Sequence, residues 1–186
     1  LLNIEHPIVL GPMASAIDHD LAAEVAEAGG LGSIPCAMLD LDQIRGQVEK
    51  YRARTVRPLN LNFFCHSPPE LNNAREAAWR ERLAPYYREL EIDPAAPVPT
   101  SNRRPFDQAI CDLVLALKPE VASFHFGLPE PALFERVKRA GIITFSSATT
   151  VAATTASNEA GSERCRRGVI TMTAATNSTR PRAAAV

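Results

Sequence analysis

The residues best suited to chemistry in this sequence follow short apolar segments. His125 stands between two phenylalanines at the end of one such segment, and Asn62 ends another. An imidazole exchanges a proton near neutral pH, and an amide can both donate and accept hydrogen bonds toward the edge of a heterocycle. Gly11 and Pro12 follow a third apolar segment, where the backbone can approach a flat ring closely. These residues indicate binding of a small heteroaromatic molecule.

Each candidate also has a structural interpretation. A single histidine at a strand end is more often structural than catalytic, and Asn62 could cap the following loop. The histidines lack HExxH spacing and the four cysteines form no CxxC pair, so we predict no metal site. The glycines of 29–32 precede an apolar segment instead of following one, so we interpret them as a helix stop and reject a dinucleotide loop.

The elements that must position these residues alternate between buried strands and amphipathic helices. Apolar runs predict five strands, at 8–10, 31–34, 58–64, 121–126 and 142–145. Helical spacing predicts helices from Asp18 or Asp20 to 28, from Asp40 or Asp42 to 51, and over 74–90, 106–117 and 131–140. This alternation predicts a parallel α/β fold, either a doubly wound sheet or a TIM-type (β/α) barrel, with ligands at the carboxyl ends of the strands.

Two segments depart from the repeat. Residues 67–105 contain Pro68, Pro69 and a charged helix, and we interpret them as an insertion that could act as a lid. Residues 152–186 contain no Leu, Phe, Tyr or Trp, and no period survives there outside Val169 to Thr173. The sequence therefore predicts an incomplete barrel of about five units over 1–151 and a disordered tail over 152–186. The Ala, Arg and Thr content of this tail suggests a frameshifted or truncated product.

Composition narrows the function classes. The net charge is −1, so there is no basic excess to attract nucleic acid. No apolar run approaches the roughly 18 residues of a membrane span, and residues 1–10 do not resemble a signal peptide. We therefore expect a cytoplasmic chain with a small-molecule partner, and no nucleic-acid or membrane partner.

Five motifs follow one another along 1–151, namely EHPIVLGPMA (5–14), AEAGGLGSI (26–34), RPLNLNFFCH (57–66), SFHFGLP (123–129) and FSSATTV (145–151). Together they resemble the motifs of the nitronate monooxygenases, a family of FMN-dependent TIM barrels. One difference is Leu10, where many members of the family have Gln. The resemblance implies oxidation of alkyl nitronates by O₂ to carbonyl compounds and nitrite, with FMN as the cofactor.

The resemblance also implies roles for particular residues. Gly11, Pro12 and Met13 would lie against the isoalloxazine ring and Asn62 would contact the flavin. His125 would lie on the substrate side, and Ser147 and Thr149 at the end of the fifth strand. The catalytic base of the family is a histidine in an AGGH-type segment, which this chain lacks, so no catalytic residue is identified and we expect weak activity or none. The alternatives are a non-enzymatic remnant and another flavin-dependent barrel, such as an enoyl reductase or an IMP dehydrogenase relative.

Overall fold

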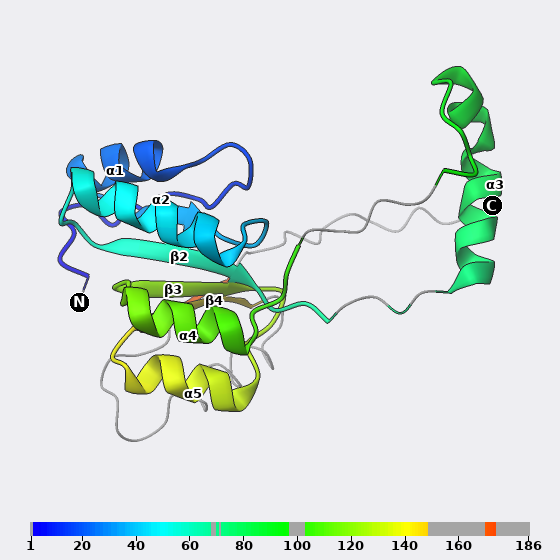
Figure 1. Ribbon diagram of the computed structural model, residues 1–186. Coiled ribbons are helices and arrows are strands. Elements are labelled where there is room, and N and C mark those ends of the chain that lie inside the picture. The colour runs from blue at the N-terminus through cyan, green and yellow to red at the C-terminus, as the bar shows by residue number, and fades with distance from the viewer. Residues whose placement is uncertain (1, 68–69, 71, 97–102, 149–169, 174–186) are drawn as a thin grey trace, which may run out of the picture. The chain divides into compact units, whose positions relative to one another are not determined.

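The computed structural model describes residues 2–67, 70, 72–96, 103–148 and 170–173 (Figure 1). These residues belong to two compact units. One unit spans 67–102, and the other combines 1–66 with 103–186. The first unit lies within the range 67–105, whose interpretation as an insertion stays a prediction, and leaves out the last three residues of that range. Those three belong to the larger unit, in which the Arg104 backbone N–H donates to the Ala37 carbonyl and Pro105 pairs with Phe64.

The larger unit is built on a parallel sheet. Its strands are β1 (Gly32–Pro35), β2 (Leu59–Phe64), β3 (Val121–His125), β4 (Ile143–Ala148) and β5 (Ile170–Thr173), and they lie side by side in that order. Every neighbouring pair is parallel. A doubly wound sheet reverses its strand order at a switch point, whereas a barrel keeps neighbours in sequence. The consecutive order therefore favours the barrel over the doubly wound sheet.

The first predicted strand, 8–10, forms a single parallel bridge between Val9 and Leu31. The Leu31 N–H donates to the Ile8 carbonyl, and the Leu10 N–H donates to the Leu31 carbonyl. Pro7 and Pro12 flank this short run and have no backbone N–H, so a longer ladder would lose donors at both ends. Residues 8–10 thus occupy the edge of the sheet beside β1 without forming a regular strand.

At the opposite edge of the sheet, β5 pairs with β4. It falls within the segment where the sequence predicts disorder, at the one place where a period survives. The boundary at 151/152 and the rest of that segment, apart from β5, lie outside the described residues, as does the site of the suggested frameshift.

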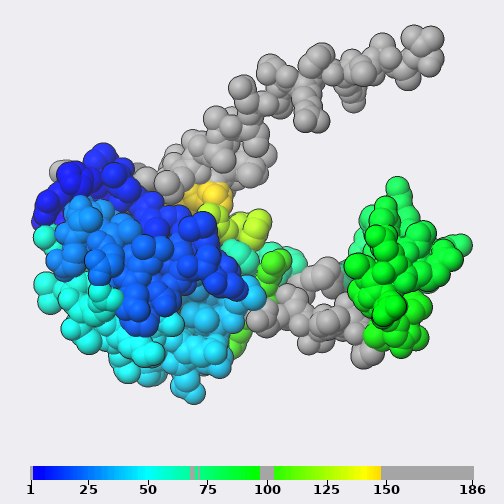
Figure 2. Space-filling view, turned by 90° about the horizontal axis from the view of Figure 1, so that it is seen from above, coloured from blue at the N-terminus to red at the C-terminus, as the bar shows by residue number. Residues whose placement is uncertain are grey.

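The first two helices begin where the sequence predicts caps. Asp18 caps α1 (His19–Glu27), and Asp40 forms a capping box with Gln43 at the start of α2 (Leu41–Arg54). Asp107 caps α4 (Gln108–Leu117), and Pro131 begins α5 (Pro131–Arg139), where its missing N–H has no cost. In the space-filling view the residues of α1, in blue, lie beside those of α2, in cyan (Figure 2).

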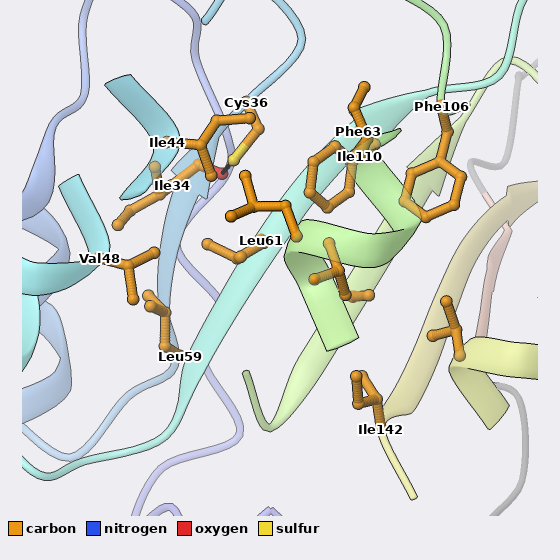
Figure 3. Close-up of a cluster of buried hydrophobic side chains, with 14 of the residues drawn as sticks. Ile34, Cys36, Ile44, Val48, Leu59, Leu61, Phe63, Phe106, Ile110 and Ile142 are labelled. Atoms are coloured by element: carbon orange, nitrogen blue, oxygen red, sulfur yellow. Dashed lines mark hydrogen bonds between the residues drawn. The ribbon is translucent and has the colours of Figure 1, made fainter. Parts of the chain in front are cut away.

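These four helices pack on one face of the sheet. The largest buried cluster joins strand residues such as Leu61 to Ile44 of α2 and Ile110 of α4 (Figure 3). It also contains Phe124 of β3 and Val137 of α5. Burying a side chain of this size contributes roughly 1.5–3 kcal/mol. A second cluster, of Leu31, Val121, Ile143 and Phe145, lies apart from the helices and includes Val9 at its margin. The sheet is thus covered by helices on one face, and its other face is the interior of the partial barrel.

The described residues of the smaller unit include one helix, α3 (Asn73–Glu89), capped by Asn72. Its described residues include no buried helical side chain, and Pro85 lies within the helix. Arg80 ties the helix to the chain that follows it, through the backbone carbonyls of Pro94 and Ala96. The lid interpretation of this unit stays a prediction.

Candidate functional site

A cavity of about 370 Å³ lies on the barrel side of the sheet, within the larger unit. This volume falls in the range of small-molecule sites, roughly 300–1,000 Å³. Its lining comes from the edge segment before α1 and from strands β2, β3 and β4. The lining residues are Val9, Leu10, Gly11, Pro12, Asn60, Ser123, Phe124, His125, Phe145, Ser146 and Ser147.

Strand register explains why residues far apart in the sequence meet here. Side chains of paired residues in parallel strands share a face, and successive residues alternate between faces. Asn62 pairs with Ser123, and Ser123 pairs with Phe145. Two residues before Asn62 on β2, Asn60 pairs with Ser33 of β1. The interior face therefore carries a row of small polar side chains between apolar ones.

The Asn60 side chain is buried, with 1% of its surface exposed. Its Nδ2 donates to the Ser33 Oγ over 2.9 Å. Its Oδ1 is buried and accepts no hydrogen bond from the described residues. Buried polar atoms are satisfied in the large majority of cases, so an unpaired acceptor beside a cavity indicates a partner outside the described protein atoms.

Asn62 is also buried, and its hydrogen bonds run toward β3. Its Nδ2 donates to the Ser123 Oγ over 2.9 Å and to the Ser123 carbonyl over 3.3 Å. These bonds link β2 to β3 beside the cavity, although Asn62 does not itself line it. The alternative in which Asn62 caps the next loop gains no support from these contacts.

His125 is the titratable group of the cavity lining, and it ends β3. Burial lowers the pKa of His125 below its ordinary value of 6.5, because the charged imidazolium loses solvation. The imidazole is therefore neutral at pH 7, with one nitrogen able to donate and the other to accept. After His125 the chain turns through Phe126 at φ 63° and Gly127 at φ 118°, both in the left-handed region.

The lowered pKa of His125 predicts a pH-dependent loss of stability. The unfolded chain takes up a proton near pH 6.5, whereas the folded chain resists protonation. The stability that depends on a neutral His125 is fully present above pH 6.5 and is lost as the pH falls toward the lower pKa of the folded state. We expect His125→Gln to lose less free energy of unfolding than the wild type between about pH 7.5 and about pH 5.5 in urea titrations. Equal losses of free energy of unfolding in the two proteins would contradict the lowered pKa of His125.

The cysteine thiols are not candidates for the chemistry. Cys36 and Cys111 are buried, and Cys65 is half-buried. Burial raises the pKa of all three thiols, that of Cys65 to about 12, so the reactive thiolate is scarce at neutral pH. Cys165 lies outside the described residues.

The structure brings four of the sequence-predicted site residues together, namely Gly11, Pro12, His125 and Ser147. Met13 lies outside the lining and is 53% exposed. Thr149 is not among the described residues. The sequence reasoning did not select the lining residues Asn60, Ser123 and Phe145. The alternation Leu59-Asn60-Leu61-Asn62 was the available signal, since it places both amides on one face.

Two negative findings apply to the described ranges. They contain no group of three or more side chains placed to hold a metal ion. Nor do they include a helix with the length and apolarity required to cross a bilayer.

Comparison with known proteins identifies relatives over most of the chain. A family model described as nitronate monooxygenase matches residues 1–165. A nitronate monooxygenase of Paraburkholderia phytofirmans is 39% identical over 152 residues, which cover 80% of this chain and 41% of the relative. One from Pseudomonas aeruginosa is 36% identical over 153 residues, covering 81% and 43%. The chain thus spans about two fifths of the length of these curated relatives.

Solved structures give a concordant result. A nitroalkane oxidase of Streptomyces ansochromogenes aligns with a TM-score of 0.73 and 32% identity, over 86% of this chain and 45% of that one. FabK of Thermotoga maritima aligns with a TM-score of 0.61 and 24% identity, over 87% and 40%. At that identity FabK supports the fold alone. Together these structures confirm a partial TIM-type barrel.

Proposed function

The chain belongs to the nitronate monooxygenase family, and on this premise we propose that its cavity receives the isoalloxazine ring of FMN for the oxidation of alkyl nitronates by O₂ to carbonyl compounds and nitrite. The observation that carries the proposal is the meeting of Gly11, Pro12, His125 and Ser147 around one cavity on the barrel side of the sheet. The family resemblance selects these residues independently of the cavity.

The described residues fit a flat heteroaromatic ring. The lining is largely apolar, with a few polar groups that could fix the orientation of a ligand. Gly11 and Pro12 would lie against the ring, and Ser147 and the unpaired Asn60 Oδ1 would meet polar atoms at its edge. Met13, Asn62 and Thr149 keep the roles that the resemblance implies for them, as proposals.

The bound flavin would supply the electron-accepting chemistry. The contribution of this chain is to orient the ring and the substrate and to exclude water. A nitronate is the conjugate base of a nitroalkane, so binding it requires placing an anion and not removing a proton. The neutral His125 can donate a hydrogen bond from one ring nitrogen to a nitronate oxygen.

The lining residues include no Lys or Arg, so no described side chain there offsets the charge of the FMN phosphate. We therefore expect riboflavin to bind this chain within about threefold of the affinity of FMN. We also expect turnover to be slow, because the described lining would hold the cofactor mainly through its ring.

The test combines a binding measurement with a product measurement. Quenching of flavin fluorescence gives the affinity for FMN and for riboflavin, and nitrite is measured with an alkyl nitronate in air. Ser147→Leu fills part of the cavity and should abolish flavin binding, whereas Ser67→Leu makes the same change at an exposed residue and should leave it intact. Absence of quenching in the wild type would overturn the proposal and favour a non-enzymatic remnant.

The same preparation separates the alternative enzyme class. A flavin-dependent enoyl reductase would reduce an enoyl thioester with NADH and release no nitrite. We expect nitrite from the nitronate and no consumption of the thioester. The reverse pattern would replace nitronate oxidation by that alternative and retain the flavin site.

A further inference from the structure

The Asn60 Oδ1 is a buried, unpaired acceptor at the proposed ring site. The residue is 99% buried and lines the cavity, and its Oδ1 accepts no hydrogen bond from the described residues. If this position served packing alone, an apolar side chain would fill the space without burying an unsatisfied oxygen.

The orientation of the Asn60 amide is set by Ser33. The hydrogen bond from Nδ2 to the Ser33 Oγ uses the nitrogen side of the amide, so the oxygen is the side left to meet a ligand. Ser33 is itself fully buried in β1. Two neighbouring strands thus hold the acceptor in place before any ligand arrives, which lowers the entropic cost of binding.

The required partner is a hydrogen-bond donor. The isoalloxazine ring of a flavin carries a single N–H group, at N3, between two carbonyls. A carbonyl oxygen such as the Asn60 Oδ1 complements that group. The partner of Asn60 on β3 is Val121, whose apolar side chain has no donor to offer to the Oδ1.

We propose that Asn60 is a positioning residue for the flavin, accepting a hydrogen bond from N3–H, with Ser33 fixing the orientation of its amide. This inference rests on the proposed flavin site and adds to it a residue and a ring atom. Asn60 acts on the orientation and affinity of the ring and takes no part in proton transfer.

The test uses two flavins and measures binding, with no requirement for turnover. FMN and 3-methyl-FMN differ by a methyl group that replaces the N3 hydrogen. We expect the wild type to bind 3-methyl-FMN about tenfold more weakly than FMN, the effect of one lost hydrogen bond to a buried group. Asn60→Leu and Asn60→Ala should each bind the two flavins with equal affinity, because neither retains the acceptor.

The two variants separate a lost hydrogen bond from a clash with the methyl group. Leucine keeps the number and branching of the heavy side-chain atoms of asparagine and is somewhat bulkier, whereas alanine is much smaller, so a clash alone would disappear only in Asn60→Ala. Discrimination that persists in Asn60→Leu would therefore overturn the proposal. Thr144→Val, a change at a buried polar residue of β4 outside the cavity lining, should leave the discrimination unchanged.

A stability measurement separates a positioning role from a structural one. The double variant Ser33→Ala, Asn60→Leu removes the unpaired acceptor together with its neighbour, and we expect its flavin-free form to melt about 2–4 °C above the wild type. A structural role predicts a lower melting temperature, and that result would count against the proposal.

If the wild type binds neither flavin, the proposed function fails as well. If it binds both equally, only the role of Asn60 is lost.

Discussion

Replacing Phe124 by alanine should lower the free energy of unfolding by about 4 kcal/mol, the usual cost of removing a large aromatic side chain from a core. Phe124 is completely buried in β3, the middle strand of the described sheet. Its ring lies 5.2 Å from that of Phe106, 6.0 Å from that of Phe134 and 6.4 Å from that of Phe63. The substitution would remove all three ring contacts at once, and the backbone of a central strand cannot collapse into the space.

Phe126 provides the matched control, because it lies two residues along the chain and is 67% exposed. Phe126→Ala keeps the left-handed backbone strain at that residue and should change the free energy of unfolding by less than about 1 kcal/mol. Urea titrations followed by circular dichroism measure both variants. A difference between them below about 1 kcal/mol would show that β3 is not held by its aromatic core.

The Phe124 prediction also concerns function, since the same strand carries Ser123 and His125 to the cavity. The side chain of Phe124 packs against α4 and α5 on the helix side, and this packing fixes the strand whose other face forms the site. Loosening the core should therefore weaken flavin binding by displacing Ser123 and His125.

The sequence could predict the elements because their signals are local. Asp18, Asp40 and Asp107 are good helix caps, and each begins a helix in the structure. The interior of the barrel was harder to predict. Strands that are buried on both faces have nearly continuous apolar sequences, so the sequence pattern rarely reveals which side chains point into the barrel.

Asn62 and Asn60 illustrate this limit. Both are amides of β2, and the family resemblance selected Asn62 as the flavin contact. Only the register with β1 and β3 shows that Asn60 lines the cavity and that Asn62 is tied to Ser123. Such pairings join residues 27 and 61 positions apart, and no local pattern encodes them.

Gly32 is a second residue whose role depends on packing between distant elements. The sequence interprets the glycines of 29–32 as a helix stop, and Gly29, at φ 89°, fits that interpretation. Gly32 serves a different purpose at the start of β1. A Cβ atom there would lie 2.3 Å from the Ala22 carbonyl oxygen of α1 and 3.3 Å from the Tyr51 ring of α2.

We therefore expect Gly32→Ala to lower the free energy of unfolding by about 3 kcal/mol, because the obstacle at 2.3 Å is backbone and α1 must shift as a body to admit a methyl group. Gly46→Ala is the matched control. Gly46 lies within α2 with no atom within 4 Å of an added Cβ, so the change should stabilise the chain by about 1 kcal/mol through helix propensity. Urea titration of both variants measures the contrast. A Gly32→Ala protein as stable as the wild type would mean that α1 can move away from β1 freely. The edge segment that carries Gly11 and Pro12 would then lack the rigid support that a preorganised ring site requires.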